Sequence, residues 1–277
     1  MAQDLYRNRD FIPDFDDIVA ETAARSRELA ARVDIRHDVP YGPGLRERMD
    51  IILPPRLAKG APLHMFIHGG YWRSGSKEDH RLIAAPVLAA GGIAAMVTYD
   101  LMPATRLGAI VGQVRAAARQ LAAMASELGA DAARMTASGH SAGAHLASYL
   151  AAIGPQESTS VNLPELRGLL LVSGIYDLTD IPGSFLKDEA KMTTAEASAW
   201  SPLTSQQLPG PRRIVMLAQM DTPPYHDQGK RFASLLQHDV PEAEFIAQPG
   251  LNHMTIVLAL GDPKSSAGLC LSGLVGD

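Results

Sequence analysis

The chain has 277 residues, of which 46% are hydrophobic and 20% charged, a composition that suits one large globular domain over residues 1–277. The formal net charge is -5 and the 25 basic residues are scattered, so neither nucleic acid nor an anionic membrane is an expected partner. The lone cysteine, Cys270, excludes an internal disulfide, and no stretch looks like a secretory signal or a membrane span, which predicts a cytoplasmic protein.

Residues 1–40 predict a polar helical arm that packs over the main body. Pro13 lies near its start, and a few apolar positions recur among many charged residues. These apolar positions are Phe15, Ile18, Val19, Leu29 and Val33.

Short apolar runs closed by turn residues follow the arm, and they are typical of buried strands. The runs are residues 49–53, 64–67, 93–99, 134–138, 169–172, 214–217 and 245–247. Helices are predicted between them, at Leu107 to Leu128 by three- and four-residue apolar steps, over 142–152, and around 228–237. This alternation predicts an α/β fold with a mostly parallel central sheet flanked by helices.

Residues 178–211 interrupt this alternation. The segment is too long for an ordinary connection and carries Phe185, Met192, Trp200 and several prolines. Because long insertions in compact domains are usually lids or binding loops, we expect a small cap here.

The five residues Gly139-His140-Ser141-Ala142-Gly143 lie between an expected strand and an alanine-rich helix. Ser141 would fall on the sharp turn between them, where the strained backbone pushes the hydroxyl out at the top of the sheet. A G-x-S-x-G pattern alone is common by chance in a chain with 24 glycines. Its strand-turn-helix setting favours Ser141 as a nucleophile.

A serine hydroxyl needs a base within hydrogen-bond reach and a carboxylate that orients that base. The serine setting resembles that of α/β-hydrolases, whose chain order is serine, acid, histidine. His253 follows the last predicted strand, and Asp221 follows the strand before it. Asp177 is the alternative acid, with a turn or helix cap as its other interpretation. We predict a triad of Ser141, Asp221 and His253.

The sequence His68-Gly69-Gly70-Tyr71-Trp72 directly follows another predicted strand. Two glycines let the backbone approach a reacting carbonyl, so the N–H groups of Gly70 and Tyr71, joined by that of Ala142, are predicted to form an oxyanion hole. A plain tight turn is the alternative, but the position before G-x-S-x-G favours the oxyanion loop. His68 is expected to be an orienting residue whose ring is hydrogen-bonded to nearby backbone, and not to act as the base.

Several residues are candidates for contact with the substrate, and the aromatic ones among them favour an apolar or aromatic acyl or leaving group. For Trp200, core packing is an equal alternative. No metal or other cofactor is expected: His64 and His68 lie four apart on a strand, with no cluster to complete a ligand set. The substrate-contact candidates are His68, Gly69, Tyr71, Trp72, His140, Trp200 and Tyr225.

Over about residues 10 to 260, these motifs together resemble the kynurenine formamidase (arylformamidase) branch of the serine α/β-hydrolases. The resemblance is carried by residues 68–72, 139–145 and 221–223 and by Asn252-His253. It implies an α/β-hydrolase fold with an N-terminal arm and a short cap, and hydrolysis of the N-formyl amide of N-formylkynurenine without metal or organic cofactor. The roles it implies are nucleophile for Ser141, acid for Asp221, base for His253, and oxyanion donors for Gly70, Tyr71 and Ala142.

Other substrates and classes stay open. Short acyl esters or carbamates are the alternative substrates, and a non-catalytic receptor or interaction protein of the same fold is the alternative from another class. Lys187, Lys191 and Arg212 are candidate partners for a substrate carboxylate, or else solvated surface. The expected partner is a small amide or ester, and a homodimer is one oligomeric state that the sequence leaves open.

Overall fold

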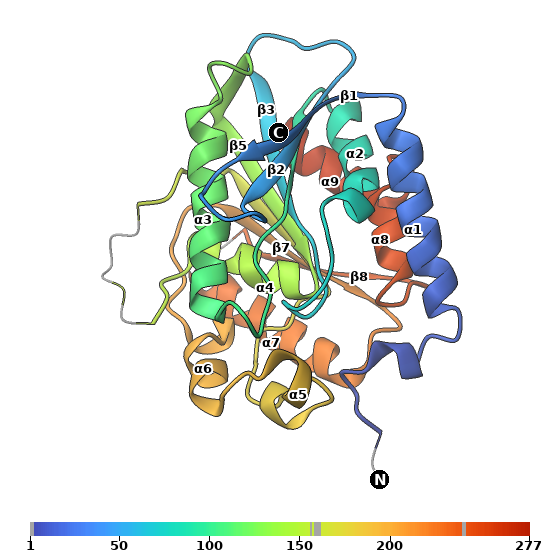
Figure 1. Ribbon diagram of the computed structural model, residues 1–277, viewed down its shortest axis with the longest axis vertical. Helices are drawn as coiled ribbons and strands as arrows, with labels where there is room; N and C mark the ends of the chain where they lie inside the picture. Colours follow the sequence, from blue (N-terminus) through green and yellow to red (C-terminus); the bar gives the residue numbers. More distant parts are fainter. Residues whose placement is uncertain (1–2, 156, 158–161, 240–241) are drawn as a thin grey trace.

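The structure is a computed structural model that describes residues 3–155, 157, 162–239 and 242–277. Within these residues, eight strands form one sheet in the order β1-β2-β4-β3-β5-β6-β7-β8 (Figure 1). From β4 to β8 in this order the strands are parallel, whereas β2 is antiparallel to both of its neighbours. The strands are β1 (Asp34–Pro40), β2 (Arg48–Leu53), β3 (Ala61–Ile67), β4 (Ile93–Val97), β5 (Ala130–His140), β6 (Gly168–Val172), β7 (Arg212–Ala218) and β8 (Glu244–Gln248).

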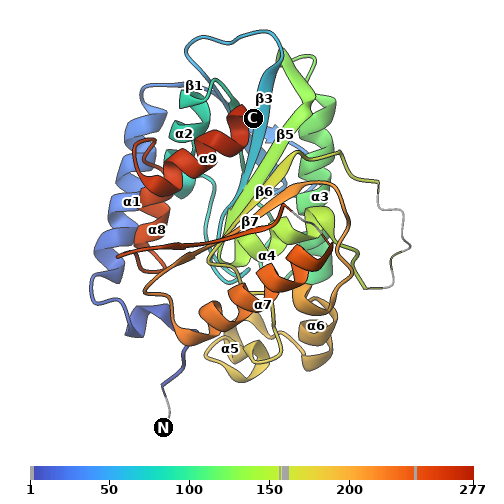
Figure 2. The same ribbon diagram turned by 180° about the vertical axis from the view of Figure 1, so that it is seen from behind.

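Helices cover both faces of this sheet (Figures 1 and 2). One face packs against α3, α4 and α7, and the other against α2, α8 and α9. The α-helices are α1 (Phe15–Ala30), α2 (Ala84–Ala89), α3 (Leu107–Ala123), α4 (Ala142–Ser148), α5 (Lys187–Ala190), α6 (Thr194–Ala199), α7 (Pro223–Asp239), α8 (Thr255–Leu260) and α9 (Ser266–Gly276). Short 3₁₀ helices are η1 (Asn8–Asp10), η2 (Glu78–Ile83), η3 (Tyr149–Ala151), η4 (Ile181–Gly183) and η5 (Pro202–Thr204).

The apolar runs of the sequence supply two cores, one on each side of the sheet. In β6, Leu169 and Leu171 belong to the core under α3 and α7, while Leu170 and Val172 belong to the core under α2 and α9. Successive side chains of a strand point to opposite faces, so a strand that is covered on both faces must be apolar throughout. The predicted α/β-hydrolase fold with a mostly parallel sheet is confirmed.

The N-terminal arm departs from the prediction at its end. Residues 34–40 form the edge strand β1 and not helix, because their backbone pairs antiparallel with β2. Helix α1 packs beside η2, and Ile18 and Ser26 face inward there. Helices α8 and α9 are not among the predicted elements, although α9 is strongly apolar.

Residues 178–211 form α5 and α6 with the short helices η4 and η5, beyond the carboxyl ends of the strands (Figure 1). Apolar side chains of this segment join the larger core, so it is packed onto the body of the protein. These side chains are Leu178, Ile181, Leu186, Ala190, Met192 and Ala197.

Candidate active site

Ser141 lies at the junction of β5 and α4 with φ +57° and ψ −122°, a conformation that side-chain-bearing residues rarely adopt. The flanking glycines make this turn possible. A Cβ atom on Gly139 would lie 2.2 Å from the carbonyl oxygen of Gly143, and one on Gly143 would lie 2.0 Å from that of Ile67. The spacing of the G-x-S-x-G motif therefore follows from how closely the turn packs on its own strand and on β3.

His253 is held by a carboxylate and by two aromatic rings. Its Nδ1 lies 2.7 Å from Oδ1 of Asp221, and its ring centroid lies 4.5 Å from that of Tyr225 and 4.8 Å from that of His140. The His140 Nε2–H donates to the backbone carbonyl of His253 at 2.8 Å. Burial, followed by the nearby charge of His253, holds the pKa of His140 well below its usual range, so His140 supports its neighbour as a neutral ring.

Asp221 is itself fixed by neighbours at the ends of β6 and β7. Its Oδ2 accepts hydrogen bonds from the Ser173 hydroxyl at 2.6 Å and from the Ala218 N–H at 3.0 Å, which leaves Oδ1 for His253. The alternative acid Asp177 instead accepts from the N–H and hydroxyl of Thr179, as a turn cap does. The structure thus brings Asp221, and not Asp177, to His253.

The loop after β3 lies against the serine turn. A Cβ atom on Gly69 would lie only 2.9 Å from the backbone carbonyl oxygen of His140, so this loop packs closely on the backbone of the turn. The His68 Nδ1–H donates to the Gly69 carbonyl at 2.7 Å, and burial lowers the pKa of His68 to about 3. In a trans peptide the carbonyl and the following N–H point in opposite directions, so this bond also fixes the Gly70 N–H. The predicted backbone contact of His68 is confirmed.

The three N–H groups predicted to form the oxyanion hole are those of Gly70, Tyr71 and Ala142. In the part of the chain that the structure describes, no protein acceptor is hydrogen-bonded to any of the three. Backbone donors inside a fold are nearly always paired, so unpaired donors beside a reactive turn are available to a ligand.

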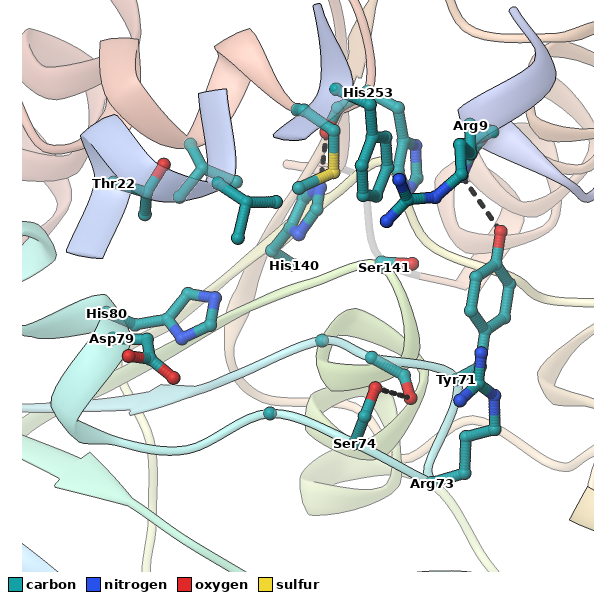
Figure 3. A pocket seen from close by; sticks show the side chains of 18 of the residues that line it. Arg9, Thr22, Tyr71, Arg73, Ser74, Asp79, His80, His140, Ser141 and His253 are labelled. Atoms are coloured by element: carbon teal, nitrogen blue, oxygen red, sulfur yellow. Dashed lines mark hydrogen bonds between the residues drawn. The ribbon is translucent and has the colours of Figure 1, made fainter. Parts of the chain in front are cut away.

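These elements surround a cavity of about 490 Å³ (Figure 3). Figure 3 shows Ser141 facing the same space as His253, His140 and Tyr71. Gly69 and Gly70 also line it. Asp221 and Tyr225 lie behind His253 and are not part of the wall.

Four of the expected substrate contacts do not line the cavity, and one of them is Tyr225, which lies behind His253. Trp72 is fully buried, and its Nε1–H donates to Nδ1 of His145 at 3.1 Å, so its indole belongs to the core. Trp200 packs edge-to-face on Tyr149, and neither indole lines the cavity. His68 is likewise buried behind the loop, stacked on Tyr99 with ring centroids 4.4 Å apart. The expectation of side-chain contact with substrate is therefore wrong for Trp72, Trp200, His68 and Tyr225.

The N-terminal arm forms a wall of the cavity, which sequence reasoning missed. Its contribution includes the apolar side chains of Phe15 and Val19 and the guanidinium groups of Arg7 and Arg9. The four-residue spacing of Phe15 and Val19 is the one available signal, and it indicates only that both lie on one face of a helix.

The charged groups at the cavity also differ from those expected. Arg212 lies at the start of β7 and pairs with Glu244 and Asp277, so it is wrong as a substrate partner. Neither Lys187 nor Lys191 lines the cavity. Instead, Arg73 at the loop after β3 pairs with Glu189 of the cap at 2.6 Å, and both line it. The remaining charged lining residues are Arg7, Arg9 and Asp79.

The residues that the structure describes contain neither a candidate metal site nor a candidate membrane span. No group of three or more His, Cys, Asp and Glu side chains there is placed to hold a metal ion. None of the described helices combines the length and the hydropathy that crossing a bilayer requires.

The chain is similar in sequence to proteins of known families. Residues 49–201 match the BD-FAE protein family. Kynurenine formamidase of Salmo salar is 30% identical over 250 residues, which cover 87% of this chain and 81% of that protein. Kynurenine formamidase of Danio rerio is 31% identical over 231 residues, covering 81% and 76%.

Solved structures share the fold. A candidate thioesterase of Silicibacter superposes with a TM-score of 0.83 and 26% identity, covering 99% of this chain and 98% of that one. A hyperthermophilic esterase of Pyrobaculum calidifontis superposes with a TM-score of 0.69 and 20% identity, covering 94% and 90%.

The sheet order, the serine turn and these relatives define a hydrolase of the α/β-hydrolase superfamily. The fold is shared by proteins with several different names, whereas the sequence similarity points to one family. The chain belongs to the kynurenine formamidase family, as the resemblance of its motifs predicts.

Proposed function

We propose that the chain is a metal-independent serine hydrolase that cleaves the N-formyl amide of a small aryl formamide, such as N-formylkynurenine, through an acyl-enzyme on Ser141. One observation carries this proposal. Ser141 and His253 line one cavity, His253 is hydrogen-bonded to Asp221, and the N–H groups of Gly70 and Tyr71 have no hydrogen-bond acceptor among the described residues.

In the proposed first step, the Ser141 Oγ attacks the formyl carbon and its proton passes to Nε2 of His253. Asp221 keeps the His253 Nδ1–H directed away from the serine and stabilises the imidazolium that forms. The carbonyl oxygen becomes negative and accepts hydrogen bonds from Gly70, Tyr71 and Ala142. When the C–N bond breaks, His253 returns the proton to the leaving arylamine.

In the second step, His253 takes a proton from water, the hydroxide oxygen bonds to the formyl carbon, and the Ser141 oxygen leaves with that proton. The products are formate and a free enzyme. The proton balance needs only the side chains of Ser141 and His253, so no further group is required by the chemistry.

The substrate class follows from the family and from the cavity. A cavity of about 490 Å³ suits a ligand the size of an aryl amino acid. Its wall combines Phe15 and Tyr71 with both guanidinium and carboxylate groups, and such a wall matches an aryl ring that carries an ammonium and a carboxylate.

A fluorophosphonate probe tests the mechanism, and paired substrates test the specificity. Mass spectrometry of the labelled protein should find the phosphonate on Ser141, and Ser141→Ala should lower kcat by at least about 10⁴-fold. The specificity constant for N-formylkynurenine should exceed that for nitrophenyl acetate. Folded protein that is not labelled at Ser141 would contradict the mechanism, and a higher constant for the ester would leave an esterase as the function.

A further inference from the structure

The segment before α1 is hydrogen-bonded to parts of the chain that lie far away in the sequence. The Asp4 carboxylate accepts from the N–H of Phe185 in the cap at 2.5 Å. The Leu5 carbonyl accepts from the Thr222 hydroxyl, next to Asp221, at 2.6 Å. These hydrogen bonds span more than 180 residues of sequence, so the segment is held by distant parts of the chain as well as by α1, with which Arg9 pairs through Asp16.

Asn8, at the start of η1, lies at the centre of these contacts and is only 5% exposed. Its Nδ2 donates to the phenol oxygen of Tyr71 at 2.9 Å and to that of Tyr225 at 3.1 Å. The two phenol oxygens are themselves 3.0 Å apart. One amide group therefore joins two tyrosines that are 154 residues apart.

The hydrogens in this cluster can be assigned by counting. The Tyr71 hydroxyl donates to the Tyr6 carbonyl, which can only accept, so the Tyr225 hydroxyl must donate to Tyr71. The two hydrogens on the Asn8 amide then serve one phenol each. Burial raises the pKa of both Tyr71 and Tyr225, so both phenols stay protonated and the cluster keeps this pattern.

Both tyrosines also touch the reacting groups. Tyr71 has φ +51° and is flanked by Gly70 at +109° and Trp72 at +58°, so its loop is in a strained conformation that the surroundings must hold. The Tyr225 ring lies against His253. A bond to each phenol thus acts on the oxyanion loop and on the base at the same time.

We infer that Asn8 is a positioning residue that sets the oxyanion loop and His253 relative to each other. This inference rests on the proposed function, because it assigns Asn8 an effect on those groups. Without the Asn8 amide, Tyr71 and Tyr225 keep one bond to each other but lose their common donor. The N–H groups and the imidazole then spend less time in the geometry that the transition state needs.

Asn8→Ala in the full chain tests the inference. We expect kcat for N-formylkynurenine or nitrophenyl acetate to fall roughly ten- to a hundredfold, less than for complete loss of an oxyanion donor, while KM changes less than threefold. Fluorophosphonate should label Ser141 at a correspondingly lower rate. A kcat within twofold of the wild-type value, or a loss confined to KM, would overturn the inference.

A double-mutant cycle separates positioning from general loosening. Tyr225→Phe keeps the ring against His253 and deletes only the hydroxyl. Because both variants break the same cluster, Asn8→Ala combined with Tyr225→Phe should cost little more in kcat than Asn8→Ala alone. Independent, multiplying losses would overturn the inference. Tyr225→Phe alone should also lower kcat, so the test survives if Asn8→Ala fails to fold.

Ser26→Ala is the matched control in the same arm. Ser26 is buried in α1, and its hydroxyl donates to the Asp79 carbonyl and accepts from the Leu82 N–H, so its loss loosens the arm without touching either tyrosine. We expect kcat within threefold of wild type, and a loss equal to that of Asn8→Ala would overturn the inference. Failure of wild-type Ser141 to react with the probe would instead reject the proposed function.

Discussion

The interior strands of the sheet and the loops at their carboxyl ends differ in backbone conformation and in polarity. Interior strands such as β4 and β6 pair in a regular register with their parallel neighbours and are buried at every residue. Of the six non-glycine residues with positive φ in the described part of the chain, four lie at those carboxyl ends. The four are Tyr71, Trp72, Ser141 and Ser173.

The difference shows which parts of the molecule stabilise the fold and which parts destabilise it. A non-glycine residue in the left-handed region costs of order 1–3 kcal/mol, whereas a buried leucine contributes about 2 kcal/mol or more. The two apolar cores can therefore hold several strained loops in place. Ser141, Asp221 and His253, the three residues of the proposed triad, follow the carboxyl ends of β5, β7 and β8, where the interior fixes the start of each loop.

Asp221→Asn should have the largest effect on kcat, because it changes the polar site at the carboxyl ends of the strands and leaves the apolar cores unchanged. An amide in place of the carboxylate favours the wrong His253 tautomer, which lowers kcat by about 10⁴-fold in other serine hydrolases. Steady-state kinetics on either substrate measures the loss. Thermal unfolding should show a folded protein, because no core side chain changes.

Asp177→Asn is the matched control for that substitution. Asp177 follows the neighbouring strand but caps a turn, so its amide variant should keep kcat within a few-fold of wild type. Equal losses in the two variants would contradict the assignment of Asp221 as the acid.

Gly70→Ala should have the next largest effect, since it acts on the strained loop directly. Gly70 has φ +109°, and an added Cβ would lie 2.3 Å from the Ser74 carbonyl oxygen. The loop must shift, and displacement of an oxyanion donor lowers kcat by about 10²–10³-fold. The kinetics should show a loss in kcat and not only a rise in KM.

Gly91→Ala sharpens the comparison, because Gly91 also has positive φ, at +76°, but a Cβ there meets nothing within 4 Å. It lies before β4, away from the cavity. We expect a loss of about 1 kcal/mol in the free energy of unfolding and an unchanged kcat. If kcat falls equally in Gly70→Ala and Gly91→Ala, backbone strain at the cavity is not the cause of the loss in kcat.

The sequence predicts the interior well because burial on two faces leaves a direct signature, an apolar run such as residues 169–172. The strand at 214–217 is confirmed for the same reason. The helix predicted at Leu107 to Leu128 from its three- and four-residue apolar steps is confirmed over Leu107–Ala123. Strand β1 was missed because it is an exposed edge strand, so its residues carry no such run.

At the carboxyl ends of the strands, the sequence predicts the main site residues but not the residues that surround them. Ser141, Asp221 and His253 carry motifs whose order in the chain is informative, and the structure brings them together. Trp72 was misplaced because a residue beside the oxyanion loop can point either way, and φ +58° turns its indole into the core. Asn8 has no motif, since its role depends on two tyrosines distant in sequence.

His145 lies on α4, between Trp72 of the core and Trp200 of the segment 178–211. It accepts from the Trp72 Nε1–H and donates from Nε2 to the Trp200 carbonyl at 2.8 Å, so it is fully used as a neutral ring. Burial, partly opposed by the bond to Trp200, lowers its pKa to about 4. Between that pH and about 6.5, the unfolded chain binds a proton that the folded chain does not, so stability falls as the pH falls.

His145→Gln removes this titration and should therefore lose less stability than the wild type on acidification. Urea unfolding measures the difference in free energy of unfolding between the wild type and this variant. That difference should be smaller by about 2 kcal/mol at pH 5 than at pH 7, at the expense of the wild type. Trp72→Phe removes the same hydrogen bond but keeps the imidazole, so its difference from the wild type should change little with pH. If the difference in free energy of unfolding between the wild type and His145→Gln stays constant from pH 7 to 5, His145 titrates alike in the folded and unfolded chains. The contrast between a neutral interior and polar loops at the carboxyl ends of the strands would then not extend to this helix.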